Sequence, residues 1–419
     1  MRSADSLAIA VDLGTTTIAV SLVNLVSGER LASAGCLNPQ RELGADVVSR
    51  LDAACRSEEA ARRMADLVRT ELHRLAEELL AQSGASRGSL RTIAVAGNPA
   101  MEHLLLGLPV RSLAFPPHRP LFTDGRHLSA RELGWELSAD VFLFPLPGGF
   151  VGGDTVAFLY GVADPPSPAP APTLYLDLGT NGEIALTAGD RFLATSAAAG
   201  PAFEGGNLAC GMAALPGAIS RVFLEGERLA VATIGGRPAV GICGSGVLDT
   251  ISLLREHGVI DVTGRLLPPA EIPSSLGNRV TEVEGAPAFI LHRDAARTVW
   301  LSQEDIRQVQ LAKGAIRAGM EVLFQRAGIL ADEVNSVILT GSFGAVLDPR
   351  SLKNVGIFTE KMVQTSLFVR EGALHGVEKA LFAPEGVTRL AGAIRVIPLS
   401  GTPAFEKNFL AHINFPQPR

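Results

Sequence analysis

One sequence pattern occurs twice in this chain, once in each half. Residues 8–20 and residues 174–186 each contain an apolar run, an aspartate, a glycine turn with hydroxyl or amide side chains, and a second apolar run. Two apolar runs joined by such a turn predict a β-hairpin. An ordinary turn would explain one copy, since Asp, Gly and Thr are common in turns. The repetition instead predicts two loops that bind one ligand between two lobes.

The turns of this pattern carry residue types that bind phosphate. Gly14 and Gly179 let backbone N–H groups approach an anion closely. Asp12 and Asp177 lie at the strand ends, where a carboxylate can hold Mg2+ through water. A third glycine turn follows a later apolar strand and suits close approach to a ribose or purine. The remaining residues of the three turns are Thr15, Thr16, Thr17, Thr180, Asn181, Gly182, Gly341, Ser342, Phe343 and Gly344.

The order of these three turns resembles that of the superfamily of sugar kinases, heat-shock ATPases and actin. Residues 152–161 and 372–380 are similar to the two connecting helices of that superfamily, and their small residues would let the helices cross closely. The resemblance implies an α/β fold of two actin-like lobes, each ribonuclease H-like, with an interlobe nucleotide cleft.

Within that superfamily the chain is most similar to the middle and C-terminal domains of the reductive activators of corrinoid proteins. The similar stretches run from residue 8 to about residue 395 and include residues 38–40, 97–98, 199–206, 210–212, 216–219 and 241–246. A helix around residues 310–316 resembles the family's helix beside the nucleotide. The resemblance therefore adds five residues to the nucleotide site: Gly205, Gly206, Gly244, Ser245 and Lys313.

The resemblance also implies an activity. It predicts an ATPase that uses ATP and Mg2+ and couples lobe closure to reduction of a Co(II) corrinoid to Co(I). The implied partner is a corrinoid iron–sulfur protein or a corrinoid methyltransferase, and we expect a homodimer.

The cysteines bear on the source of electrons. The activators carry a [2Fe–2S] cluster in an N-terminal domain, which we do not expect here because the first phosphate strand begins a few residues after Met1. Cys36, Cys55, Cys210 and Cys243 also lack cluster or zinc spacing. Cys210 and Cys243 are either small buried residues or a shared site. We therefore expect no iron–sulfur cluster in this chain and a separate ferredoxin-like electron donor.

Three carboxylates are candidates for ordering the attacking water. Asp154 begins the first connecting-helix segment, where it either caps the helix or faces the nucleotide. Glu183 and Glu204 follow glycine turns and can poise water or metal. Two other functions stay open: a small-molecule kinase with Asp154 or Asp249 as base, and a nucleotide-gated chaperone or scaffold for a corrinoid protein.

Composition excludes other classes. The net charge is −6, and no Lys/Arg run alternates with aromatic residues, so we expect no nucleic-acid binding. The most apolar window, residues 141–162, contains prolines, glycines and Asp154, which argues against a membrane span. The N-terminus does not resemble a signal peptide. We expect a cytoplasmic protein.

The predicted organisation is a first lobe over residues 1–163, a proline-rich linker over 164–172, a second lobe with the C-terminal connecting helix over 173–397, and a tail over 398–419. Apolar spacing predicts long helices over residues 57–82 and 302–327, with Ser57 and Ser302 at their starts. The tail is either an arm packed on the body or a strand that docks a partner.

Overall fold

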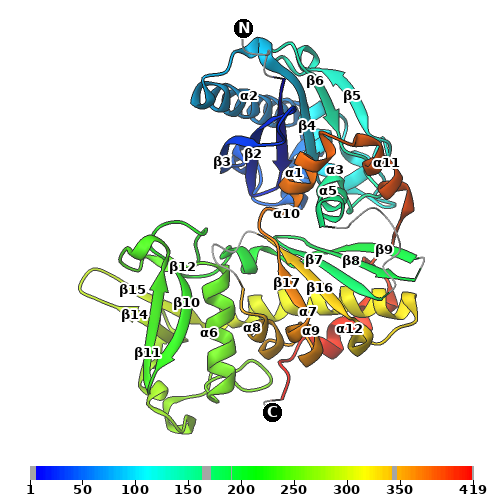
Figure 1. Ribbon diagram of the computed structural model, residues 1–419. Coiled ribbons are helices and arrows are strands. Elements are labelled where there is room, and N and C mark those ends of the chain that lie inside the picture. The colour runs from blue at the N-terminus through cyan, green and yellow to red at the C-terminus, as the bar shows by residue number, and fades with distance from the viewer. Residues whose placement is uncertain (1–5, 163–170, 190, 342–346, 418–419) are drawn as a thin grey trace. The chain divides into compact units, whose positions relative to one another are not determined.

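The computed structural model describes residues 6–162, 171–189, 191–341 and 347–417 (Figure 1). Two compact units make up the chain: residues 1–168 with 371–396, and residues 169–370 with 397–419. Most of the predicted linker lies outside the described residues. The predicted second lobe of residues 173–397 differs from this division, because residues 371–396 belong to the first unit. The physical reason is that the second connecting helix packs on the first one.

The first unit is built on a mixed sheet with strand order β3-β2-β1-β4-β6-β5. Strand β1 is antiparallel to β2 and parallel to β4, and Leu13 pairs with Gly97 at the carboxyl ends of β1 and β4. Loops that follow these two strands therefore meet at one edge of the sheet. The strands are β1 (Leu7–Leu13), β2 (Thr17–Asn24), β3 (Arg30–Leu37), β4 (Leu90–Gly97), β5 (Arg126–Ser129) and β6 (Asp140–Leu143).

The long helix predicted over residues 57–82 is confirmed as α2 (Glu58–Ser83). The Ser57 hydroxyl accepts a hydrogen bond from the N–H of Ala60, and Gly84 ends the helix with a φ of 67°. Its buried face packs into the apolar core of the first unit through Met64, Val68, Leu72, Leu75 and Leu79. The shorter helices are α1 (Val47–Arg56), α3 (Pro99–Leu106) and α4 (Arg111–Ala114).

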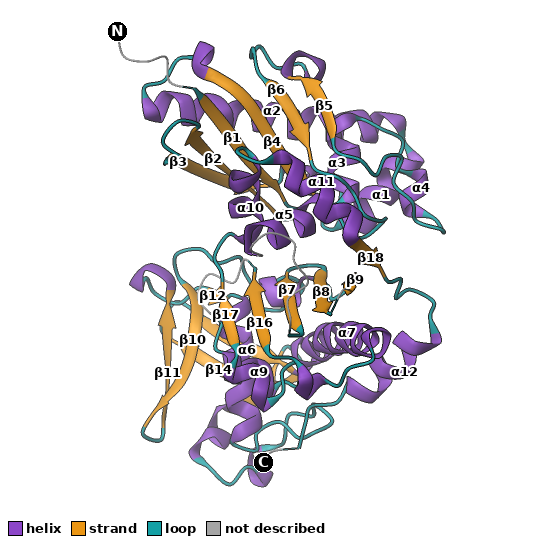
Figure 2. Cartoon of the chain, turned by 45° about the vertical axis from the view of Figure 1, so that its right-hand side comes forward, coloured by secondary structure: helices purple, strands orange, loops and turns teal. Residues whose placement is uncertain are grey.

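The two connecting helices are α5 (Gly153–Val162) and α10 (Gly372–Ala380), and they cross closely within the first unit (Figure 2). A Cβ on Gly376 would lie 1.6 Å from the carbonyl oxygen of Ala157. A Cβ on Gly161 would lie 2.9 Å from the nitrogen of Gly376. The prediction that small residues permit this crossing is confirmed. Helix α11 (Pro384–Ala393) and strand β18 (Ile394–Val396) follow α10.

The second unit has a sheet in which the strands run in the order β17-β16-β7-β8-β9. Strand β7 is antiparallel to β8 and parallel to β16, as β1 is to β2 and β4. The hairpin repeat in the sequence is therefore also a repeat of local topology. The strands are β7 (Thr173–Leu178), β8 (Gly182–Ala188), β9 (Arg191–Ala197), β16 (Ser336–Thr340) and β17 (Ser366–Phe368).

Helix α7 (Gln303–Ala327) confirms the second long helix predicted from the sequence. Ser302 and Asp305 form a complete capping box at its start: the Ser302 hydroxyl accepts from the Asp305 N–H at 3.1 Å, and the Asp305 carboxylate accepts from the Ser302 N–H at 2.8 Å. Other helices of this unit are α6 (Gly244–Glu256), α8 (Pro349–Asn354), α9 (Glu360–Gln364) and α12 (Pro403–His412).

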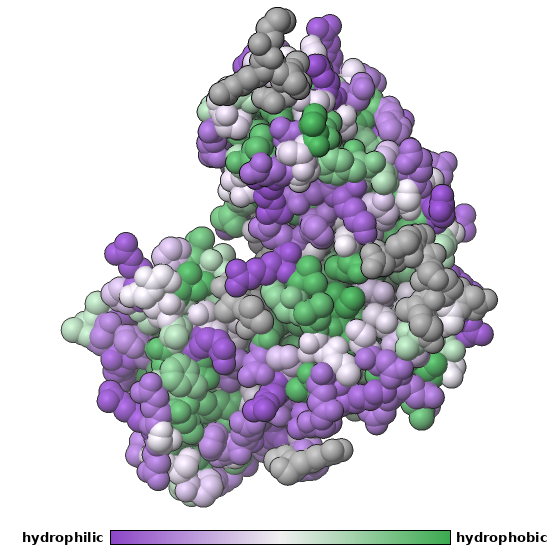
Figure 3. Space-filling model, viewed as in Figure 1, coloured by the Kyte–Doolittle hydropathy of each residue, from purple (hydrophilic) through white to green (hydrophobic). Residues whose placement is uncertain are grey.

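Two small sheets complete the second unit, with orders β11-β10-β12 and β13-β14-β15. Val222 and Leu229 are buried in the core, whereas Phe223 is 38% exposed, as the alternation of a strand requires. Figure 3 shows apolar side chains gathered over β10 and β11. The strands are β10 (Ala218–Glu225), β11 (Arg228–Thr233), β12 (Gly241–Ile242), β13 (Val280–Val283), β14 (Ala286–Arg293) and β15 (Thr298–Ser302).

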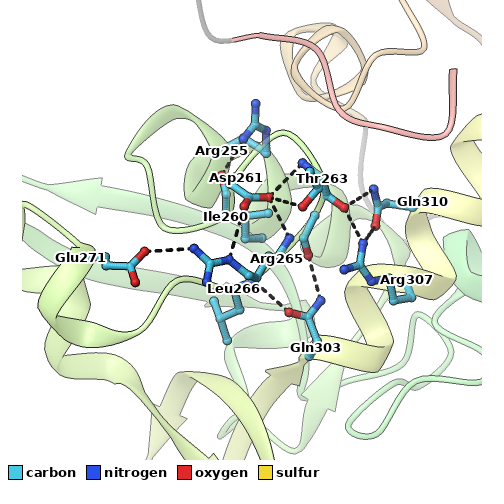
Figure 4. Close-up of polar contacts among 11 residues, drawn as sticks. Arg255, Ile260, Asp261, Thr263, Arg265, Leu266, Glu271, Gln303, Arg307 and Gln310 are labelled. Atoms are coloured by element: carbon cyan, nitrogen blue, oxygen red, sulfur yellow. Dashed lines mark hydrogen bonds and ion pairs between the residues drawn. The ribbon is translucent and has the colours of Figure 1, made fainter. Parts of the chain in front are cut away.

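The loop after α6 is fastened to α7 by side-chain hydrogen bonds (Figure 4). Asp261 Oδ1 accepts from the N–H groups of Thr263 at 2.8 Å and Arg265 at 3.0 Å. From α7, Gln303 Oε1 accepts from the N–H of Leu266 at 2.8 Å, and Gln310 Nε2 donates to the carbonyl of Thr263 at 3.1 Å. This loop forms part of the surface on which the C-terminal tail lies.

The tail is an arm packed on the second unit, which decides between the two alternatives left by the sequence. Helix α12 packs against α7. Phe415 is 4% exposed, and its N–H donates to the carbonyl of Val262 at 2.9 Å.

Among the described residues, none of the helices has the length and apolar character needed to cross a membrane.

Candidate functional site

The tip of the β1–β2 hairpin is held from one side by side chains of neighbouring segments. Asn38 Nδ2 donates to the carbonyl of Gly14 at 2.9 Å, and Arg50 Nη2 donates to the carbonyl of Thr15 at 2.8 Å. Because C=O and N–H of a trans peptide point in opposite directions, the N–H groups of Thr15 and Thr16 point away from Asn38 and Arg50. The predicted phosphate loop thus presents donors on the opposite side from these two side chains.

Arg50 lies behind this tip as a buried cation. Its side chain is 0% exposed, and its Nε donates to the carbonyl of Gly44 at 2.9 Å. Burial lowers the pKa of Arg50 to about 10, so the guanidinium remains charged at neutral pH. A positive charge with carbonyl partners adds to the attraction of the tip for an anion.

Three more polar residues of the first unit gather at the same edge of the sheet. Asp12 pairs with Ala96 across β1 and β4, and Asn98, which follows β4, donates from Nδ2 to Thr15 Oγ1 at 2.9 Å. A Cβ on Gly152 would lie 2.6 Å from the Cα of Asn98, so the chain just before Asp154 touches the end of β4. Asp12, Thr15, Asn98 and Asp154 therefore lie on segments that meet at one edge of the sheet.

Asp154 is half-buried in the first turn of α5, and its Oδ1 accepts from the N–H of Thr155 at 2.7 Å. Burial raises the pKa of Asp154 to about 6, against the effect of its hydrogen bonds with Thr155. At neutral pH most of this carboxyl is ionised, and it can accept a proton. The hydrogen bond with Thr155 is compatible with both roles that the sequence suggested for Asp154, capping the helix or facing the nucleotide.

The β7–β8 hairpin of the second unit has its own polar tip. The N–H of Gly179 donates to the carbonyl of Asn181 at 3.1 Å and closes the turn before Gly182. The Thr180 hydroxyl donates to Glu204, which ends the short helix over residues 201–204. Glu204 therefore contacts this tip through Thr180.

Asp177 and Glu183 face each other across β7 and β8, and Thr340 of β16 pairs with Asp177 on the other side. Ser196 on β9 donates from Oγ to Glu183 Oε1 at 3.2 Å. Glu183 thus takes part in cross-strand bonding one residue beyond the tip.

Four residues that the family resemblance added to the nucleotide site have structural roles in the second unit: Gly205, Gly206, Gly244 and Ser245. The N–H of Gly205 donates to Ala202 and that of Gly206 to Pro201, so neither amide is directed at a ligand. Ser245 is 1% exposed and donates from Oγ to the carbonyl of Ser220 at 2.9 Å. A Cβ on Gly244 would lie 1.6 Å from the carbonyl oxygen of Phe203, so this glycine permits close packing of α6.

Lys313 holds the C-terminal tail. Its side chain is 1% exposed, and its Nζ donates to the carbonyls of His412, at 2.5 Å, and Asn414, and lies 5.3 Å from the ring centre of Phe415. Burial lowers the pKa of Lys313 to about 7. The predicted contact with a nucleotide was based on helix resemblance alone, and this geometry directs the ammonium elsewhere. We therefore leave Lys313 out of the proposed site.

The remaining predicted residues are those of the third glycine turn and Asp249. Ser342, Phe343 and Gly344 of the third turn lie outside the described residues, and Gly341 at its start has a φ of 140°. Asp249 accepts from Arg221 at 2.7 Å and from Ser351 at 2.9 Å. This pairing leaves it poorly placed as the base of a kinase.

The sequence predicts that Asp12 and Asp177 bind Mg2+ through water, and each of them lies at the end of a strand of its own unit. Within the described parts of the chain, no group of three or more His, Cys, Asp or Glu side chains is arranged for direct metal binding. Taken separately, each carboxylate lies beside a phosphate-type tip, where one carboxylate suits an ion that is bound mainly by water and phosphate.

Comparison with known families decides the identity of the fold. Residues 7–163 match the RACo middle region, and residues 171–419 match the C-terminal domain of RACo, the ASKHA domain. The chain belongs to the RACo family. Its α/β fold is that of the ASKHA superfamily, as the sequence predicted.

Relatives of this family member include the corrinoid activation enzyme RamQ of Eubacterium limosum, 28% identical over 97% of this chain and 70% of RamQ. A [Co(II) methylated amine-specific corrinoid protein] reductase of Methanosarcina barkeri is 26% identical over 85% of this chain and 67% of the reductase. A solved reductive activator for corrinoid, iron–sulfur protein superposes with a TM-score of 0.88 at 29% identity, covering 100% of this chain and 67% of the activator.

Only some residues of this site could be predicted from the sequence. Asn38 and Asn98 lie in stretches that resemble the family, but nothing in them showed that their amides bind the first tip. Arg50 was missed altogether, since an arginine in an amphipathic helix is usually on the surface. Its 0% exposure is a property of the tertiary fold.

Proposed function

We propose that this RACo family member binds and hydrolyses ATP, and that the tips of both hairpins hold its phosphates. The observation that carries this proposal is the recurrence of one Asp–Gly–Thr tip at the same place in two topologically alike hairpins. In the first tip, Asn38 and Arg50 also bind the carbonyl oxygens, which turns the N–H groups toward the opposite side. Phosphoryl transfer depends mainly on such positioning and on charge neutralisation.

The residues have distinct tasks in this reaction, in which ATP and water give ADP and phosphate. The N–H groups of Thr15 and Thr16 bind phosphate oxygens, and the Arg50 charge favours the anion. Asp154 accepts a proton from the attacking water, for which its pKa of about 6 is suited. Asp12 and Asp177 would hold Mg2+, which neutralises phosphate charge when bound.

The relatives suggest what hydrolysis is used for. Their names describe corrinoid activation and reduction of a Co(II) corrinoid protein. We propose that this chain likewise supports the one-electron reduction of a Co(II) corrinoid in a partner protein to Co(I). The electron comes from a low-potential iron–sulfur donor, which is oxidised by one electron in the same step. A change in lobe closure between the ATP and ADP states would couple hydrolysis to this transfer.

The test uses the purified chain, a corrinoid protein and titanium(III) citrate as reductant. We expect the visible spectrum of Co(II) to be replaced by that of Co(I) only when Mg-ATP is added. Asp12→Ala and Asp177→Ala should each abolish ATP turnover while circular dichroism remains that of the wild type. Unchanged hydrolysis in both variants would refute the site, and hydrolysis with no cobalt change would point to a scaffold role.

We also propose that the protein is a homodimer and acts in the cytoplasm. Light scattering after gel filtration measures the first property, and a molar mass of one chain would contradict it.

A further inference from the structure

Glu102 is a buried carboxyl for which the proposed hydrolysis has no use. It lies on α3, directly after the carboxyl end of β4, and is 0% exposed. Its Oε1 accepts from the N–H of Gly97 at 3.2 Å. Its Oε2 is also buried and has no hydrogen-bond partner among the described residues. An ionised carboxylate in this position would be costly.

The first turn of α5 rests on this carboxyl. A Cβ on Gly153 would lie 2.5 Å from Glu102 Oε1 and 2.6 Å from the Cβ of Phe144. Only a glycine lets the helix approach so closely. The next residue is Asp154, so Glu102 supports the segment that carries the proposed proton acceptor.

Glu102 packs against Gly153 and is affected by the charge of Asp154, and two neighbouring carboxyls favour one shared negative charge over two. Asp154 is better suited to carry it: it is half-buried, lies in the first turn of a helix, and accepts from the N–H of Thr155 at 2.7 Å. Glu102 is fully buried and has a single long hydrogen bond. Burial and the charge of Asp154 raise the pKa of Glu102 well above its usual range.

The neighbouring charged groups do not change this assignment. Arg50 directs its donors to Thr15, Gly44, Gln40 and the sulfur of Met101. His103, on the same helix as Glu102, is held between the carbonyl of Pro99 and the N–H of Leu121. Burial lowers the pKa of His103, so it is neutral at neutral pH.

We propose that Glu102 is a positioning residue that carries the proton of a buried carboxyl pair, supports the first turn of α5 and leaves Asp154 as the ionised member. This inference rests on the proposed ATP hydrolysis for its functional meaning. The protonation of Glu102 itself can be measured without any nucleotide.

The first experiment is infrared spectroscopy of the full chain at neutral pH. The C=O stretching band of a protonated buried carboxyl lies in a spectral region separate from that of the bands of ionised carboxylates. We expect such a band in the wild type and its loss in Glu102→Gln. Glu132→Gln, which changes an exposed glutamate of the same unit, is the matched control and should retain the band. A wild type without the band, or a Glu102→Gln variant that keeps it, would overturn the proposal.

The second experiment is the pH profile of kcat for ATP hydrolysis. Glu102→Ala should lower kcat about tenfold because the support under α5 is lost, and Glu102→Gln should restore most of that loss, with KM for ATP altered less than about twofold. The acid midpoint of Glu102→Gln should equal that of the wild type, because one neutral group replaces another. A shift of that midpoint to lower pH by about one unit would show that Glu102 is ionised and would overturn the proposal.

The two experiments separate the inference from the proposed function. If the wild type hydrolyses no ATP but the infrared band is present and depends on Glu102, the proposed function fails and the protonated pair stands. If hydrolysis depends on Asp154 but the band is absent, the pair is wrong and the proposed function stands.

Discussion

Replacing Arg50 by methionine tests whether a buried charge builds the first phosphate tip. Methionine keeps much of the apolar stem and removes the donors. The Arg50→Met change leaves the carbonyls of Thr15 and Gly44 without the bonds that now measure 2.8 and 2.9 Å.

The magnitude follows from these two acceptors. A buried carbonyl left without a donor costs about 1–3 kcal/mol. Part of that cost is offset, because burial of the guanidinium is itself unfavourable, as its pKa of about 10 indicates. We expect the free energy of unfolding of the first unit to fall by about 2–4 kcal/mol. The freed Thr15 peptide should also raise KM for ATP about tenfold, which corresponds to about 1.4 kcal/mol.

The assay combines urea denaturation with steady-state hydrolysis kinetics. Arg69→Met is the matched control, because Arg69 Nε donates to the carbonyl of Leu105 at 2.7 Å at a place away from the tip. This control should lose about 1 kcal/mol of stability and keep the wild-type KM. If Arg50→Met is destabilised but binds ATP as well as Arg69→Met does, the role of Arg50 in the tip is refuted and only a structural role remains.

Three further outcomes are expected. Gly376→Ala should lower the free energy of unfolding by about 2–4 kcal/mol in urea melts, since its Cβ would lie 1.6 Å from the carbonyl of Ala157, whereas Gly392→Ala, with open space around it, should be near neutral. Lys313→Ala should make the C-terminal arm cleave faster in limited proteolysis without changing KM for ATP, and an unchanged cleavage rate would contradict the anchoring role. Folded Asp154 keeps its proton up to a pKa of about 6, while the unfolded chain releases it near pH 4, so wild-type stability should fall as pH rises between these values. Asp154→Asn should lack that fall and be about 1–2 kcal/mol more stable at neutral pH, and parallel pH curves for the two proteins would argue against burial of this carboxyl.

Local patterns predicted much of the fold. The hairpins, the two long helices and their serine caps depend on residues close in sequence, and the structure confirms them. The close crossing of α5 and α10 was also predictable, because only small residues permit it. The compact unit to which residues 371–396 belong depends on a long-range contact instead, since α10 packs on α5.

In the candidate site, too, local sequence patterns could not predict what depends on tertiary packing. Asp12 and Gly14 could be placed at a tip because they lie in the repeated pattern itself. Lys313 looked available on a helix, yet tertiary packing buries it against the tail. Arg50 and Glu102 looked like ordinary polar residues of helices, and their 0% exposure comes from the packing of α1 and α3 against neighbouring segments. Charges that a fold encloses cannot be found from spacing alone.

The most direct test of the central claim is calorimetric titration of the chain with a nonhydrolysable ATP analogue and Mg2+. The account predicts one nucleotide per chain, with affinity lost in both Gly14→Val and Gly179→Val. Two nucleotides per chain, or full affinity in either variant, would contradict the claim that the two tips serve one ATP.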